Sequence, residues 1–127
     1  MSESIPELMG EILRFRDQRE WGQFHTLKNL AAALSIEAAE LQETMLWNQD
    51  SELTALLQKD PAFKDHVAEE IADVLIYALL LCNEIDVEPL NAIRSKLALN
   101  EKKYPLEKSR GNATKHDQLP STRPQGD

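Results

Sequence analysis

The chain has little glycine, a single cysteine and almost none of the β-branched alternation that is typical of sheets. Four glycines in 127 residues, together with 42% hydrophobic residues, favour a helical globular protein. The single cysteine, Cys82, lies inside an apolar stretch, which excludes a disulfide framework and a cysteine-based zinc motif. A chain of this length can form one domain with its own core but has no room for a second.

Basic faces and long apolar runs are also lacking. The formal charge of −8 argues against an electrostatic nucleic-acid binder, although a metal ion could still recruit a nucleotide. The longest apolar run, Val74 to Cys82, is far too short to cross a bilayer, and the first 20 residues show no signal-peptide pattern. We therefore expect a soluble cytoplasmic protein with neither nucleic acid nor a membrane as partner.

Hydrophobic periodicity predicts an all-α, antiparallel helical bundle. Thr26 and Asp60-Pro61 carry the capping chemistry of helix starts, and the aromatic segment 21–25 interrupts the pattern as an ordered loop. The predicted helices span about residues 6–19, 26–47, 51–57 with Ser51 as the cap, and 61–84, followed by a fourth long helix marked by Leu90, Ile93 and Leu97. We expect one helical domain over residues 1–110 and a largely disordered tail over 111–127.

Two acidic pairs stand inside the helical stretches, Glu37 with Glu40 and Glu70 with Asp73. A spacing of three residues places both carboxylates of a pair on one helical face, about 60° apart around the axis. If the two helices faced each other, the four carboxylates would repel and lose hydration unless a cation joined them. An all-oxygen ligand set suits Mg²⁺, with Mn²⁺ as a substitute. The alternative is an ordinary solvated helix face.

The residues around the acidic pairs favour the metal site. Glu37 and Glu40 adjoin an apolar stripe, and the row is expected to run on to Trp47. Glu70 and Asp73 adjoin a second stripe, with Tyr77 in their row. The expected core positions of the two stripes are Leu27, Leu30, Leu34, Ala38, Leu41 and Met45 in the first, and Val67, Ile71, Val74, Leu75, Ala78, Leu79 and Cys82 in the second.

Other residues are compatible with further chemistry, and each also has a simpler structural interpretation. A di-iron centre would need Glu-x-x-His motifs, and neither acidic pair contains histidine, although His66 precedes Glu70 by one turn. In the fourth long helix, Lys96 and Lys103 could contact phosphates and Asn100 a base edge, or they could form an ordinary basic helix end. Arg110 and Lys115 are either tail charges or a phosphate clasp.

The sequence resembles the MazG-like all-α nucleotide pyrophosphohydrolases, and most closely their dCTP diphosphatase branch. The resemblance covers about residues 5 to 117 and rests on motifs that occur in this order: Trp21-Gly22-Gln23-Phe24-His25, Asn29-Leu30, Glu37-Ala38-Ala39-Glu40-Leu41 through Trp47, Glu70-Ile71-Ala72-Asp73-Val74-Leu75-Ile76-Tyr77, and Lys96 with Asn100 to Pro105. Ile12 departs from the pattern, because the animal dCTP enzymes are expected to have a base-contacting histidine there.

The resemblance implies a homodimer or homotetramer that uses Mg²⁺ to hydrolyse a nucleoside triphosphate, dCTP or a modified dCTP, to the monophosphate and pyrophosphate. The implied catalytic metal ligands are Glu37, Glu40, Glu70 and Asp73. The implied substrate-binding residues, for the base and the phosphates, are Trp21, His25, Lys28, Trp47, Tyr77, Lys96, Asn100, Tyr104 and Arg110. Two alternatives stay open, a phosphoribosyl-ATP pyrophosphohydrolase-like enzyme and a helical interaction module without enzymatic activity.

Overall fold

The computed structural model describes residues 3–118, and every regular element in that range is a helix. The chain divides into two compact units, residues 1–87 and residues 88–127. The predicted helical class is therefore confirmed for the described residues. The predicted domain boundary at residue 110 stays a prediction, and residues 119–127 of the predicted tail lie outside the described range. The described part of that tail contains a short 3-10 helix, η2 (His116–Gln118).

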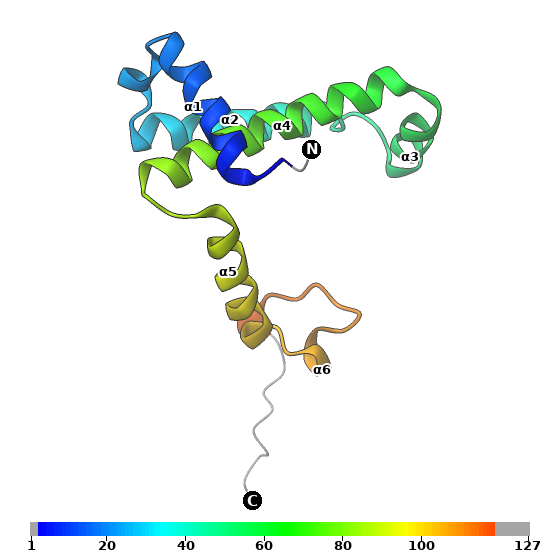
Figure 1. Ribbon diagram of the computed structural model, residues 1–127. Coiled ribbons are helices and arrows are strands. Elements are labelled where there is room, and N and C mark those ends of the chain that lie inside the picture. Colours follow the sequence, from blue (N-terminus) through cyan, green and yellow to red (C-terminus); the bar gives the residue numbers. More distant parts are fainter. Residues whose placement is uncertain (1–2, 119–127) are drawn as a thin grey trace, which may run out of the picture. The chain divides into compact units, whose positions relative to one another are not determined.

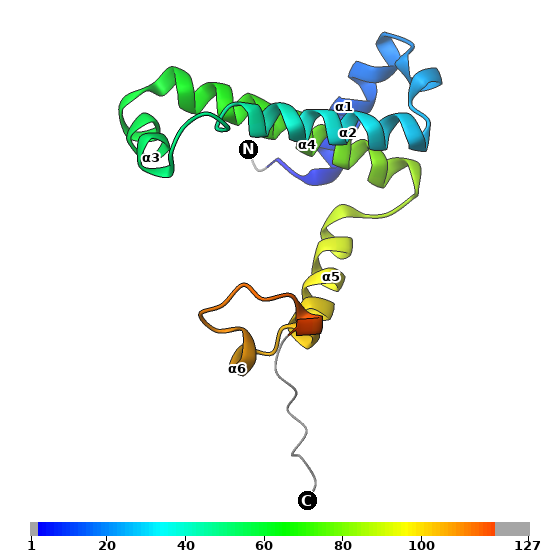
Figure 2. The ribbon, with the colours of Figure 1, turned by 180° about the vertical axis from the view of Figure 1, so that it is seen from behind.

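The first unit is organised around an antiparallel pair of helices, α2 (Leu27–Glu43) and α4 (Pro61–Glu84). These two helices make the most extensive contact in the fold and lie side by side in Figures 1 and 2. Two further helices, α1 (Ile5–Gln18) and α3 (Asp50–Lys59), pack against α4. A 3-10 turn, η1 (Trp21–Phe24), connects α1 to α2.

Local capping chemistry explains where these helices begin. The Thr26 hydroxyl accepts a hydrogen bond from the Asn29 N–H at 3.2 Å, and the Asp60 carboxylate accepts from Ala62 and Phe63 at 3.1 and 3.3 Å. Both predicted starts are confirmed. The predicted cap of the short helix was wrong, because α3 begins at Asp50 with Gln49 as N-cap. The negative charges of Asp50 and Glu52 in the first turn stabilise this start by interacting with the positive end of the helix dipole.

The second unit contains α5 (Pro89–Lys103) and the one-turn α6 (Leu106–Ser109). Glu88 caps α5, since its carboxylate accepts from the Leu90 and Asn91 N–H groups at 3.2 and 2.8 Å. The predicted fourth long helix is therefore present. None of the described helices combines the length and the apolar character needed to cross a membrane.

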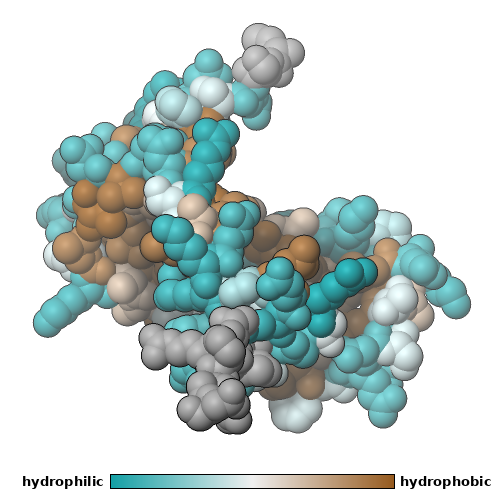
Figure 3. Space-filling view, turned by 90° about the horizontal axis from the view of Figure 1, so that it is seen from below, coloured by the Kyte–Doolittle hydropathy of each residue, from teal (hydrophilic) through white to brown (hydrophobic). Residues whose placement is uncertain are grey.

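Few side chains are buried in the single chain. Among the described residues, the buried apolar side chains are Leu30 on α2 and Val67 and Leu80 on α4. Leu27, Ile71 and Leu75, which we expected in the core, are exposed at 52%, 42% and 57%. Apolar surface is visible in brown in Figure 3. The predicted stripes are real as sequence patterns, but the helices of the first unit, taken by themselves, do not cover both of them.

The burial of two leucines of α2 predicts that their substitution by alanine destabilises the protein to different extents. Leu30 is 1% exposed whereas Leu27, one turn earlier, is 52% exposed. We expect Leu30→Ala to lower the free energy of unfolding by about 2–5 kcal/mol through lost burial and a residual cavity. Leu27→Ala should lower the free energy of unfolding of the monomer by clearly less. Chemical denaturation of both variants at one protein concentration checks this, and equal losses would contradict the assigned core.

Candidate active site

Three carboxylates from the two central helices converge in the first unit. Glu37 of α2 and Glu70 and Asp73 of α4 each place one oxygen so that the three oxygens lie within 4.8 Å of one another. Glu37 and Glu70 are half-buried and Asp73 is exposed. We call these three residues the acidic cluster. Its geometry follows from the antiparallel pairing of α2 with α4, which brings the two acidic rows to one place.

The fourth predicted ligand, Glu40, lies beside the acidic cluster. It is exposed, and its carboxyl group lies next to that of Glu37. Burial raises the pKa of Glu37 to about 7, with further contributions from the adjacent Glu40 carboxyl and from the negative charges of Asp73 and Glu70. A proton held on Glu37 near neutral pH therefore relieves both the desolvation of this carboxylate and the repulsion from its neighbours.

Two oxygens of the acidic cluster lack a hydrogen-bond partner within the protein. They are Oε2 of Glu37 and Oε2 of Glu70, and both atoms are buried. Buried carboxylate oxygens normally have a donor or a cation as neighbour. An all-oxygen donor set with two unpartnered buried oxygens fits a hard divalent cation. The residues present therefore suit the metal that the sequence predicts.

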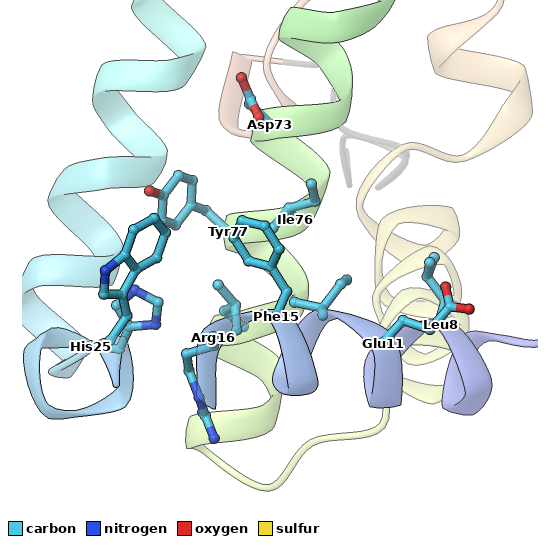
Figure 4. Close-up of a pocket in the computed structure, with 11 residues that line it drawn as sticks. Leu8, Glu11, Phe15, Arg16, His25, Asp73, Ile76 and Tyr77 are labelled. Atoms are coloured by element: carbon cyan, nitrogen blue, oxygen red, sulfur yellow. The ribbon is translucent and has the colours of Figure 1, made fainter. Parts of the chain in front are cut away.

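A cavity of about 460 Å³ opens beside the acidic cluster and reaches it through Asp73. Its lining comes from α1, η1 and α4, together with His25 (Figure 4). The lining residues are Leu8, Glu11, Ile12, Phe15, Arg16, Trp21, His25, Asp73, Ile76, Tyr77 and Leu80. The cavity is mostly apolar, and its size is in the range of small-molecule sites.

Three predicted substrate-binding residues, Trp21, His25 and Tyr77, line this cavity. Burial, followed by the charges of Glu37, Asp73 and Glu40, raises the pKa of Tyr77, so its phenol stays a neutral hydrogen-bond donor near the acidic cluster. The Nδ1 atom of His25 is buried without a partner. Sequence reasoning did not assign Leu8, Phe15 or Arg16 to a site, although the apolar spacing of Leu8, Ile12 and Phe15 on one helix could have indicated a shared wall.

A second hollow, of about 390 Å³, borders Glu70. It is lined by Glu40, Glu43, Thr44, His66 and Glu70, and we call it the polar recess. Glu43 and His66 therefore lie near the acidic cluster. Because Glu40 and Glu70 also line the polar recess, a water molecule there would have several carboxylate acceptors within the same hollow.

The predicted helical row does not reach Trp47. Helix α2 ends at Glu43, and the Thr44 and Met45 N–H groups bond to the carbonyls of Leu41 and Gln42, three residues back, at 3.2 and 3.1 Å. Trp47 follows this tightened turn and is 88% exposed. The expected alignment of Trp47 with Glu37 and Glu40 was therefore wrong. Lys28, also exposed, lies in the first turn of α2.

The remaining predicted contacts belong to the second unit. Lys96 and Asn100 lie on α5, Tyr104 follows α5, and Arg110 follows α6. The Tyr104 and His116 rings meet edge to face with centroids 5.9 Å apart. Tyr104 and Arg110 share a hollow of about 530 Å³ with Glu101, Leu106 and Ser109. The convergence of these residues with the acidic cluster stays a prediction.

Comparison with known proteins gives a consistent result. The model of the MazG-like family matches residues 32–119. The chain is 38% identical to dCTP pyrophosphatase 1 of Rattus norvegicus and 35% identical to that of Homo sapiens, in each case over 106 residues that make up 84% of this chain. The chain spans 62% of the length of these curated relatives.

A solved structure adds to these relatives. A pyrophosphatase from Archaeoglobus fulgidus superposes with a TM-score of 0.74 at 42% sequence identity, covering 83% of this chain and 95% of the other. The likeness thus extends over nearly the whole of that protein.

The raised pKa of Glu37 predicts how the stability of the metal-free protein depends on pH. The folded state holds this proton up to about pH 7, whereas an ordinary glutamate has a pKa of 4.5. The stabilisation is complete below the lower value and is lost as pH rises through the higher one. We expect the melting temperature in EDTA to fall across this window, and to fall less for Glu37→Gln.

Glu69→Gln is the matched control, because Glu69 is an exposed neighbour on α4 outside the acidic cluster. It should keep the pH profile of the unsubstituted protein in calorimetry. Identical profiles for Glu37→Gln and the unsubstituted protein would show that the proton is not held at Glu37.

Proposed function

The chain belongs to the MazG-like family, and from this premise we propose that it is a Mg²⁺-dependent nucleoside triphosphate pyrophosphohydrolase. Its products would be a nucleoside monophosphate and pyrophosphate, and its preferred substrate dCTP or a modified dCTP. The observation that carries the proposal is the acidic cluster, in which Glu37, Glu70 and Asp73 bring three oxygens within 4.8 Å of one another. The named relatives support the substrate class.

In this mechanism Glu37, Glu40, Glu70 and Asp73 would hold the metal. Bound there, Mg²⁺ supplies the positive charge that offsets the triphosphate and the charge developing at the α-phosphoryl group. The side chains around it orient the substrate and the attacking water. A carboxylate of the acidic cluster, or Glu43 in the polar recess, accepts the proton of that water. Attack at the α-phosphorus breaks the bond to the pyrophosphate leaving group.

The cavity beside Asp73 would hold the nucleoside. Trp21 supplies an aromatic face, and His25 and Tyr77 supply polar groups at its wall. Base–aromatic stacking contributes about 1–3 kcal/mol per base in single-strand binders. Trp47, 88% exposed, and Asn100 would complete the enclosure of the base. Ile12 gives this wall an apolar side chain, which favours contact with a carbon substituent over a hydrogen bond.

Charge is divided between the two units in a way that suits a phosphate substrate. Residues 1–87 carry 17 acidic side chains and six Lys or Arg, whereas residues 88–127 carry eight Lys or Arg and five acidic side chains. We therefore propose that the second unit supplies most of the cations that contact the triphosphate. Lys96, Tyr104 and Arg110 would contact phosphate oxygens, with Lys28 as a further cation from α2.

A screen for pyrophosphate release tests this function. With Mg²⁺ and a panel of common and modified nucleoside triphosphates, we expect release of pyrophosphate, greatest with dCTP or its 5-substituted forms. Release of orthophosphate, or no turnover of any nucleotide, would contradict the proposal.

Asp73→Asn is the variant that links turnover to the acidic cluster. It should lower kcat by about 100-fold or more, because the ligand charge is lost, with the helical circular-dichroism signal unchanged. Relief of repulsion should raise the melting temperature without metal. Glu69→Gln on the same helix should stay active, and full turnover by Asp73→Asn at saturating Mg²⁺ would remove Asp73 from the metal site.

We also propose that the chain works as a homodimer or homotetramer. Each unit, taken by itself, exposes apolar side chains, among them Ile71 and Leu75 on α4 and Ile93 and Leu97 on α5. Exposed apolar residues at helical spacing on two helices favour self-association. Light scattering at micromolar concentration should give at least twice 14.4 kDa, and activity per chain should fall on dilution. A fully active monomer would contradict this proposal.

A further inference from the structure

The turn between α1 and α2 presents Trp21 at the wall of the cavity. Glu20, just before it, has a left-handed backbone with φ of 55°. The rings of Trp21 and Phe15 meet edge to face, with centroids 5.7 Å apart. The Arg19 guanidinium lies 3.7 Å from the centroid of the Phe15 ring. Contacts within the α1–η1 segment thus determine the local orientation of Trp21.

Those contacts do not join the turn to the helix that carries Asp73. The hydrogen bonds around η1 are equally local: the Gln23 amide donates to the Glu20 carbonyl at 2.9 Å, and the Asn29 amide donates to the Phe24 carbonyl at 2.8 Å. The turn is joined to α4 indirectly, through the packing of α1 against that helix. An interaction that reaches α4 from beside the turn would fix the distance of Trp21 from the acidic cluster more closely.

Arg16 supplies that interaction. Its Nε lies 2.8 Å from Oδ1 of Asp17, and one terminal nitrogen lies 3.7 Å from Oε1 of Glu84 in the last turn of α4. Among the described residues, the pair with Glu84 is the one ion pair that joins two helices. The Arg16 side chain is only 17% exposed, so this contact is partly shielded from solvent.

The Arg16 side chain also lies against the turn. A Cβ placed on Gly22, the residue after Trp21, would lie 3.4 Å from Nε of Arg16 and 3.8 Å from its Cδ and Cζ. The backbone of η1 therefore lies close to the guanidinium. In Figure 4 the stem of Arg16 borders the cavity while its guanidinium points away from Asp73 and Tyr77. This orientation suits a role in holding the wall rather than in binding the substrate.

We propose that Arg16 is the positioning residue for Trp21: by joining η1 to the last turn of α4 through Gly22 and Glu84, it holds the indole at the cavity wall before substrate binds. The effect of Arg16 on catalysis rests on the proposed function. Its effect on the order of Trp21 does not. A wall ordered in advance spares the substrate the entropic cost of ordering it. Loss of Arg16 should therefore weaken nucleotide binding and leave the chemical step nearly unchanged.

The order of Trp21 can be measured without any nucleotide. The chain has two tryptophans, so in a Trp47→Phe background the emission reports Trp21 alone. In that background we expect Arg16→Gln to increase acrylamide quenching of Trp21 by about 2-fold and to lower its fluorescence anisotropy. Arg16→Lys, which keeps the charge but not the planar group, should give an intermediate value. Arg14→Gln, an exposed arginine on the same helix, should have no effect.

Kinetics in the natural Trp47 context provide the second measurement. Arg16→Gln should raise KM by about 3- to 10-fold with kcat within about 2-fold, as expected when binding energy common to the ground and transition states is lost. Glu84→Gln, which removes only the partner on α4, should act in the same direction, and the double variant should add little to Arg16→Gln. If Arg16→Gln does not fold, Glu84→Gln tests the same interaction in its place.

The outcomes separate the alternatives. Increased Trp21 quenching in a chain that hydrolyses no nucleotide would support the positioning role and overturn the proposed function. A raised KM with unchanged quenching would mean that Arg16 contacts the substrate, and would overturn the positioning role. Equal quenching and equal KM for Arg16→Gln and Arg14→Gln would also overturn it.

Discussion

Repulsion among carboxylates held between α2 and α4 is the constraint on which the rest of the structure depends. Glu37, Glu70 and Asp73 place oxygens within 4.8 Å of one another, and burial together with the charges of the neighbouring carboxylates raises the pKa of Glu37 to about 7. Like charges stay this close only if the two helices that carry them are held together. The most extensive helix contact and the buried residues Leu30, Val67 and Leu80 all lie on these two helices.

The same repulsion bears on how charge is distributed along the chain. The unit of residues 1–87 is strongly acidic, whereas the unit of residues 88–127 is basic. Under the proposed function a metal ion alone would not neutralise a triphosphate beside several carboxylates, and the second unit carries more Lys and Arg than the first. The proposed dimer would cover apolar residues that are exposed on α4 and on α5.

The sequence predicted the features that depend on local chemistry. The starts of α2 and α4 follow from the capping groups of Thr26 and Asp60, and the approach of Glu37 to Glu70 and Asp73 follows once those helices pair. The end of α2 could not be predicted, because the apolar pattern continues through Leu41 and Met45 while the backbone tightens at Thr44. The wall formed by Phe15 and Arg16 was missed because it depends on how α1 crosses α4, a tertiary contact without a motif.

The central claim is that the acidic cluster binds a divalent cation, and Mn²⁺ titration followed by electron paramagnetic resonance tests it most directly. The signal of free Mn²⁺ reports how much metal remains unbound, without reference to any substrate. We predict saturable binding with at least one site per chain, competed by Mg²⁺ and lost in a Glu37→Gln/Glu70→Gln double variant. Equal Mn²⁺ binding by this variant and the unsubstituted protein would contradict the account.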